Sequence, residues 1–168
     1  MELKEMFLGQ LEREAAAARK TIERVPEGHN DWKPHEKSMT LGYLAALVAT
    51  MPGWAEFMID RDELDLGGPE GEKFKTRTFG TRDEMLKAFE EGLAGSRRAL
   101  QNTTEEHLLK PWRFAMGGQT LFEAPRYQVL SESLFCHLAH HRGQLTVYLR
   151  LNDAKVPAIY GPSADEFH

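Results

Sequence analysis

Two histidines, His137 and His141, stand four residues apart in the last third of the chain. On a helix, residues four apart project from one face, so two imidazoles at this spacing can share a single metal ion. Neutral imidazole is a good ligand for zinc, nickel, copper or iron(II). A histidine on an inward face can instead be a core residue whose ring nitrogens are satisfied by hydrogen bonds. The spacing by itself leaves both interpretations open.

The residues around this pair carry weaker signals. On a helix, Cys136 points away from the histidine face, and we expect a packed or partly exposed thiol rather than a ligand. His140 falls on a neighbouring face, and Gln144, one turn beyond, can orient it by a hydrogen bond. We expect Arg142 to form an outward ion pair or to guard a cleft. Gly143 costs about 1 kcal/mol relative to Ala within a helix, which close approach of another helix or chain would explain.

Hydrophobic spacing predicts four helical segments that would position this pair. Apolar residues at steps of three and four define segments 3–25, 41–58, 81–102 and 125–151. Ser38 is the expected N-cap of the second segment, and Thr81 with Glu84 has the pattern of a capping box. Pro52 removes a backbone hydrogen bond and should kink the second segment. Pro125 suits the first turn of the fourth.

A different pattern lies between the third and fourth helical segments. Residues 111–115 and 119–122 flank Met116-Gly117-Gly118, and their alternation predicts a small β-hairpin. Four long helices with short to medium connections predict an all-α protein, a four-helix bundle on which the hairpin packs. His137 and His141 lie on the stripe that should face the bundle interior. There is no repeat or long linker, so residues 1–168 should form a single domain.

The composition limits the classes of function. The chain has 168 residues, of which 41% are hydrophobic and 28% charged, and its formal net charge is −5. A mildly acidic chain without a basic run is unsuited to the phosphate backbone of a nucleic acid. The single cysteine, Cys136, excludes an internal disulfide and a cysteine-rich zinc site.

The sequence also lacks membrane and targeting signals. The apolar stretch 41–59 contains Glu56 and Pro52-Gly53, which favours a buried helix over a membrane span. The first residues have neither the basic start nor the apolar run of a secretory signal. We therefore expect a cytoplasmic protein with no membrane partner.

The histidine pair belongs to an ordered series of segments. These are residues 34–42, Met51-Pro52-Gly53-Trp54, Trp112 with Gly117-Gly118, Pro125-Arg126, the run His137-x-x-x-His141-Arg142-Gly143-Gln144-Leu145, and residues 156–166. The series covers most of the chain and resembles the DinB/YfiT-like family. The HxxxHRGQ segment is fairly specific, and the ordered set is much more so.

This resemblance implies a four-helix bundle of up-down-down-up type, commonly a homodimer, with a divalent metal ion such as zinc or nickel held by three histidines. Two of these correspond to His137 and His141. The third belongs on the second helix, in the turn before Met-Pro-Gly-Trp, where this sequence has Leu47. Leucine cannot ligate a metal. We therefore favour a partly degenerate metal site in which Leu47 packs in the core. The alternative is a relocated ligand such as Glu56 or His35.

Two functions follow. The resemblance implies a metal-dependent transferase similar to thiol-S-transferases, or a hydrolase, acting on an unknown small molecule, with the ion polarising an electrophile or activating a thiol or water. The alternative is a non-catalytic small-molecule-binding or sensing protein that has kept the pocket and lost the metal site through Leu47. The sequence indicates no organic cofactor and no nucleic-acid partner.

Overall fold

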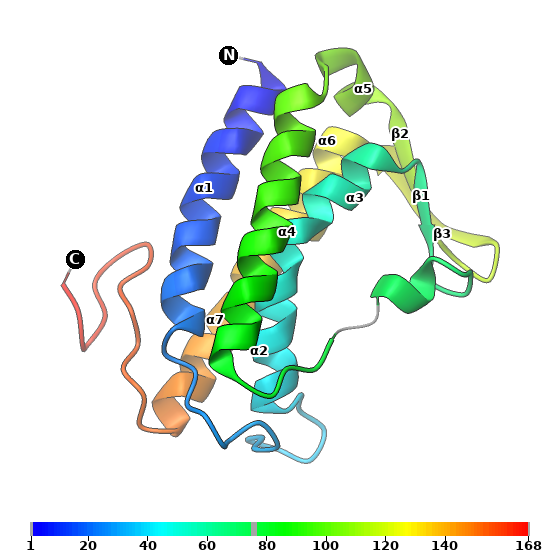
Figure 1. Cartoon of the computed structure of the whole chain (residues 1–168). Coiled ribbons are helices and arrows are strands. Elements are labelled where there is room, and N and C mark those ends of the chain that lie inside the picture. Colours follow the sequence, from blue (N-terminus) through cyan, green and yellow to red (C-terminus); the bar gives the residue numbers. More distant parts are fainter. Residues whose placement is uncertain (1, 75–76, 168) are drawn as a thin grey trace.

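The computed structural model describes residues 2–74 and 77–167 and is mostly helical with a small sheet (Figure 1). The helices are α1 (Leu3–Ile22), α2 (Leu41–Thr50), α3 (Trp54–Asp60), α4 (Arg82–Asn102), α5 (Glu105–Leu109), α6 (Arg126–Val129) and α7 (His137–Leu151). The strands are β1 (Glu63–Asp65), β2 (Pro111–Met116) and β3 (Gln119–Pro125). Short 3₁₀ segments are η1 (Met51–Gly53) and η2 (Gly71–Phe74), and η3 (Leu130–Cys136) is π-helical.

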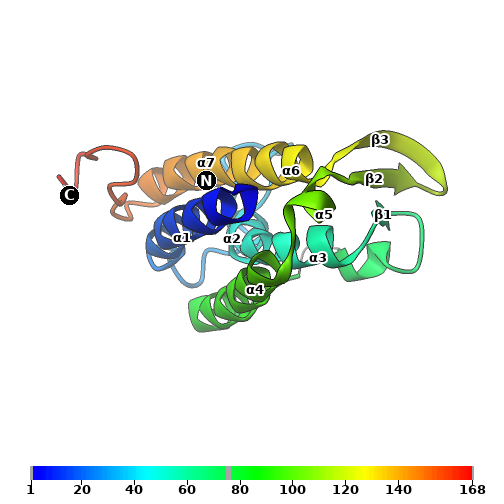
Figure 2. The same cartoon turned by 90° about the horizontal axis from the view of Figure 1, so that it is seen from above.

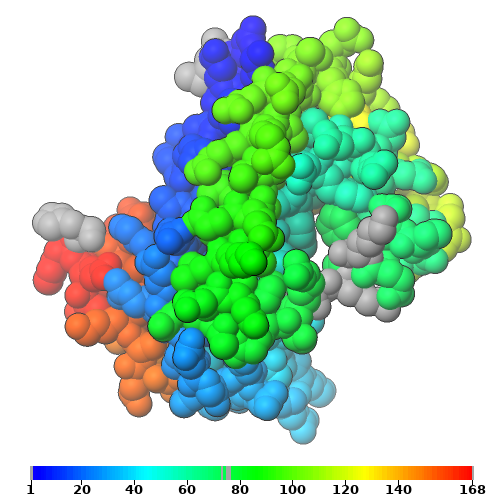
Figure 3. All heavy atoms as spheres, in the orientation of Figure 1, coloured from blue at the N-terminus to red at the C-terminus, as the bar shows by residue number. Residues whose placement is uncertain are grey.

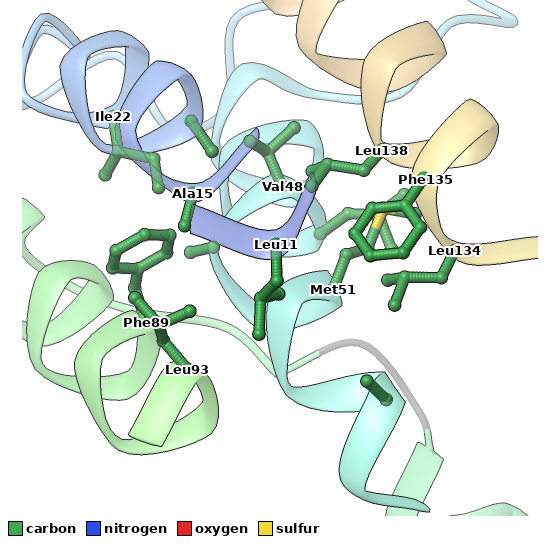
Figure 4. Packing of buried hydrophobic residues seen from close by; sticks show 14 of the residues in the cluster. Leu11, Ala15, Ile22, Val48, Met51, Phe89, Leu93, Leu134, Phe135 and Leu138 are labelled. Carbon is green, nitrogen blue, oxygen red and sulfur yellow. The ribbon is translucent and has the colours of Figure 1, made fainter. Parts of the chain in front are cut away.

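The long helices α1, α2, α4 and α7 lie side by side around one apolar core, and the sheet stands at one end (Figures 1 and 2). Each helix turns an apolar stripe inward, because residues three and four apart share a face. Figure 4 shows side chains from these helices and from η3 meeting in the core, among them Leu11, Val48, Phe89 and Leu134.

The ends of the helices show how well local signals predict structure. Thr81 and Glu84 form the predicted capping box at the start of α4. The prediction of Ser38 as the N-cap of the second segment is wrong, since the Thr40 hydroxyl accepts from the Tyr43 N–H, 3.2 Å away, and α2 begins at Leu41. The first helix ends at Ile22 rather than near residue 25. Pro125 lies at the end of β3 and precedes α6, instead of belonging to the first helical turn.

The second and fourth predicted helices are each interrupted. At Pro52 the second becomes the 3₁₀ segment η1 and continues as α3, as expected of a proline inside a helix. The fourth is π-helical over η3 before α7 begins at His137. Such π segments are often found at functional sites, and this one ends at the residue before His137.

The strands form one sheet in the order β1–β2–β3. Strands β2 and β3 pair antiparallel, and the turn between them holds Gly117 and Gly118 at φ of 57° and 82°. These are left-handed values that favour glycine. Strand β1, which the sequence did not indicate, pairs parallel with β2. The Asp65 carboxylate accepts from the backbone N–H groups of Gly117 and Gly118 at 2.7 and 2.6 Å, which ties β1 to the turn.

Buried Arg126 fixes the sheet to the helices. Its guanidinium donates to the carbonyl oxygens of Met58 at 3.1 Å, Arg61 at 3.0 Å and Pro111 at 3.0 Å, and it pairs with the Asp62 carboxylate. The bonds join the end of α3, the start of β2 and the first residue of α6. This arrangement sets the position of the hairpin relative to α3.

The C-terminal segment lies on the opposite side of the molecule from the sheet (Figures 1 and 3). It is held by an ion pair between Glu166 and Arg24, which follows α1, and by an ion pair between Asp165 and Arg150 on α7. Within residues 2–74 and 77–167, no helix combines the length and the apolar character that a membrane span requires.

Candidate functional site

The structure brings the two predicted histidines into direct contact. The Nε2 atoms of His137 and His141 lie 2.8 Å apart, and the ring centroids are separated by 4.5 Å. Both residues are on the first turns of α7, so this approach follows from their i, i+4 spacing. Whether the pair binds a metal stays a prediction, but both imidazoles present the same nitrogen to one point.

Each of the two rings has a further hydrogen-bond partner. Nδ1 of His141 lies 2.8 Å from Oε1 of Gln144, and the ring of His137 is hydrogen-bonded to the backbone of Ser133. If Nδ1 of each ring donates its proton, both Nε2 atoms carry lone pairs toward each other, and a further proton or a metal cation must lie between them. If the Gln144 amide is turned over and donates, one Nε2–H can bond the other ring directly. The contact therefore fits either a shared cation or a hydrogen-bonded pair.

Burial favours the neutral form of both rings, which is the form that binds a metal. His141 is buried and His137 is half-buried. Desolvation lowers the pKa of both imidazoles, and the charge of neighbouring histidines lowers it further. Hydrogen bonds to Ser133 and Gln144 oppose this shift, but burial is the larger cause.

A cavity of about 750 Å³ opens beside the pair. Its wall is built from α2, α3, the sheet, η2, η3 and the start of α7, and apolar side chains predominate in it. Among the described residues, the lining includes His137 but not His141. Trp54, the last residue of the Met-Pro-Gly-Trp segment, also lines the cavity, and its ring centroid is 5.9 Å from that of His137.

Leu47 lies on the wall of the same cavity, 8% exposed and part of the core. No group of three or more His, Cys, Asp or Glu residues able to hold a metal occurs within the described part of the chain. The relocated ligands considered from the sequence do not supply a third donor. The carboxylate of Glu56 pairs with Arg98, and Nδ1 of His35 accepts from the Lys37 N–H. The donor set therefore does not fit a three-histidine centre, whereas the two Nε2 atoms fit a two-ligand site.

Two expectations for the neighbouring residues need correction. Gln144 bonds His141, not His140, because a residue three positions ahead on a helix is as close as one four ahead. Cys136 is exposed as expected, but with His140 it lines the same cavity as His137 instead of pointing away from it. Cys136 is the last residue of the π-helical η3 and directly precedes His137.

Arg142 is directed inward, contrary to the expected outward ion pair. It is 1% exposed, and its guanidinium lies 2.7 Å from the Glu14 carboxylate and donates to the Glu14 carbonyl oxygen at 3.1 Å. The Tyr160 hydroxyl donates to the same carboxylate at 2.7 Å and accepts from Arg142. Sequence reasoning missed this network, since Glu14 falls within an apolar stripe 128 positions away and has no local signal.

Solved structures share this fold. A DinB-like protein from Bacillus cereus ATCC 10987 matches with a TM-score of 0.70 at 19% sequence identity, over 93% of this chain and 97% of that chain. A DinB-like protein from Bacillus subtilis matches with a TM-score of 0.67 at 18% identity, over 90% and 96% of the two chains. No family model matches the sequence, and no curated protein is significantly similar to it. The chain therefore has the fold of DinB-like proteins.

Proposed function

We propose that this chain is a four-helix-bundle protein of the DinB type that binds a small molecule in the cavity beside a reduced, two-histidine site for a divalent cation. The observation that carries the proposal is the 2.8 Å approach of the Nε2 atoms of His137 and His141 next to that cavity. Leu47 on the cavity wall takes the place of a third metal ligand. We therefore favour a function in binding a small molecule over a function in catalysis.

Several features support the cation site. His141 is buried and His137 half-buried, Nδ1 of His141 is held by Gln144, the ring of His137 is hydrogen-bonded to the backbone of Ser133, and the two Nε2 atoms converge. A hydrogen bond to the ring nitrogen that does not bind the metal orients a ligating imidazole and raises its basicity. Two protein ligands hold an ion less firmly than three, so we expect weak and labile binding of zinc or nickel.

The cavity supports the small-molecule part of the proposal. Its volume of about 750 Å³ is in the range of known ligand sites, and such sites are mostly apolar with a few polar groups. Here the polar groups, among them Ser133, Cys136 and His140, gather on η3 and α7 near the histidine pair. The apolar wall provides affinity, and this polar edge provides orientation.

A second candidate function is a metal-dependent transferase or hydrolase. It is favoured by the position of His137, which borders both the cavity and the pair. A divalent cation held there would supply a Lewis acid. The chain itself would orient the bound molecule between the apolar wall and the polar edge, and the closed core behind α7 would exclude water from one side.

The test of the cation site is a metal titration. Metal-free protein is dialysed against zinc or nickel and analysed for bound metal, together with His137→Ala, His141→Ala and, as the matched control, His140→Ala. We expect about one ion per chain, weakly held, that is lost in the first two variants and kept in the control. Substoichiometric metal at saturating concentrations, or equal binding by all variants, would contradict the proposal. Hydrolysis of 4-nitrophenyl acetate by the loaded protein, absent in His137→Ala, would favour the second candidate.

A further inference from the structure

The chain after α7 folds back along the outside of the helices (Figure 1). It is anchored by Pro157 and Ala158, which are buried, and by Val156, which packs against the core. Residues 159–166 then form an arm in which no residue is buried. The position of this arm therefore depends on polar contacts and not on the burial of apolar side chains.

Two ion pairs hold the far end of the arm. Asp165 pairs with Arg150 on α7, and Glu166 pairs with Arg24, which follows α1. The four side chains are between 20% and 48% exposed. Ion pairs that water can reach contribute little to stability and are screened by salt, with a Debye length of about 3 Å at 1 M. Both links are therefore weak and depend on ionic strength.

The same two carboxylates also bind the anchor of the arm. The Val156 N–H donates to Asp165 at 2.8 Å, and the Ala158 N–H donates to Glu166 at 3.0 Å. Both N–H groups lie outside the helices and strands. Their protection from hydrogen exchange therefore depends on the arm staying in place, and these two reporter amides indicate whether it does.

Tyr160 joins the middle of the arm to the buried pair of Glu14 and Arg142. Its hydroxyl donates to the Glu14 carboxylate at 2.7 Å and accepts from Arg142. Its ring centroid lies 5.1 Å from the guanidinium carbon of Arg142. The tyrosine is 75% exposed, whereas Arg142 is 1% exposed. An exposed side chain of the arm thus lies over a buried ion pair.

We propose that residues 159–166 are a latch that opens and closes as a unit while the helices stay folded, and that rising ionic strength favours the open state. Opening breaks both ion pairs and takes Tyr160 away from Glu14 and Arg142, while the buried anchor keeps the arm attached. Segments with few buried apolar contacts open locally at a lower free energy than the core of a protein. The latch needs neither a metal ion nor a bound molecule, so it is independent of the proposed function.

Amide hydrogen exchange followed by NMR tests the latch in the intact chain, at low salt and at about 1 M sodium chloride. The two reporter amides should exchange about 3- to 10-fold faster at the higher salt concentration, because screening weakens both ion pairs. The amide of Leu145, in the middle of α7, should exchange far more slowly and show no such acceleration. Reporter amides that exchange as slowly as Leu145, or that do not respond to salt, would overturn the proposal.

The variant Tyr160→Phe tests the middle of the arm, because it keeps the ring and removes the hydroxyl. At low salt its reporter amides should exchange about 10-fold faster than those of the native chain. Tyr127→Phe is the matched control, since Tyr127 is a partly exposed tyrosine on α6, outside the arm. Equal exchange of the reporter amides in the two variants would contradict the latch.

The double variant Asp165→Asn, Glu166→Gln tests the source of the salt response. Its reporter amides should exchange faster than in the native chain at low salt, and added salt should have little further effect, because no ion pair is left to screen. Glu12→Gln is the control, since it removes an exposed ion pair with Arg97 far from the arm and should leave the salt response unchanged. A salt response that persists in the double variant would show that the ion pairs do not control the arm.

Discussion

The hydroxyl of Ser96 on α4 donates to the carbonyl oxygen of Pro52 at 2.6 Å and accepts from the backbone N–H of Glu56 at 3.1 Å. In a regular helix that N–H would donate to that carbonyl, four residues before it. The serine side chain is therefore inserted into the helix where α2 changes through η1 into α3. Gly53 and Gly92 allow this approach, because a Cβ on Gly53 would lie 3.0 Å from the Gly92 Cα.

This insertion predicts the effect of Ser96→Ala. The change leaves the Pro52 carbonyl oxygen and the Glu56 N–H without their partner, so the free energy of unfolding should fall by about 1–3 kcal/mol. Urea denaturation measures it, with Ser131→Ala at a half-buried position of η3 as the control. An equal loss of unfolding free energy in both variants would show that the hydrogen bonds of the inserted Ser96 hydroxyl do not stabilise the fold.

The buried pair of Glu14 and Arg142 predicts a larger effect. Glu14→Gln leaves the 1% exposed guanidinium without its counter-ion, and the free energy of unfolding should fall by about 3–5 kcal/mol. The matched control is Glu12→Gln on the same helix, where the exposed pair with Arg97 should contribute less than about 1 kcal/mol. Chemical denaturation of both variants distinguishes a buried network from general loss of charge on α1.

The histidine pair predicts a pH dependence of stability. Burial lowers the pKa of His137 and His141 in the folded chain, so the unfolded chain binds protons on these residues at a higher pH. Their contribution is complete above the ordinary histidine pKa and is lost as the pH falls through the lowered values. In EDTA, unfolding free energy should therefore drop between about pH 7 and pH 5.

Urea denaturation across that range checks the sign and the residues responsible. The double variant His137→Asn, His141→Asn should show a smaller drop than the native chain, and His140→Asn should retain it. A native chain that becomes more stable on acidification through this range would contradict the assignment.

Leu47→His predicts a gain of metal affinity. Leu47 and His137 line the same cavity, so an imidazole at position 47 adds a third donor on its wall. Zinc affinity should rise by at least on the order of tenfold, which corresponds to about 1.4 kcal/mol. Competition titration measures it, and Thr50→His, one turn further along α2 and outside this cavity, is the control. Equal affinity in the native chain and Leu47→His would show that Leu47 is not the missing position.

The local features of this protein follow from its sequence. The apolar periodicity predicts the long helical segments, Pro52 predicts their interruption, and Thr81 with Glu84 predicts a cap that the structure contains. The contact between His137 and His141 also follows from spacing, since the two residues lie one turn apart on the same helix. Each of these depends on residues within a few positions of one another, so local geometry decides them.

Tertiary structure decided the rest. Strand β1 pairs with a segment 50 positions away, and Arg142 finds Glu14 across 128 positions. The π-helical η3, whose last residue Cys136 lines the cavity, and the cavity itself depend on how α2, α3, the sheet and α7 pack. The sequence by itself determined that two imidazoles would share one face. Only the packing of distant elements decided that His137 would border a cavity lined by Leu47 and aromatic side chains, because such contacts are set by the whole core and not by neighbouring residues.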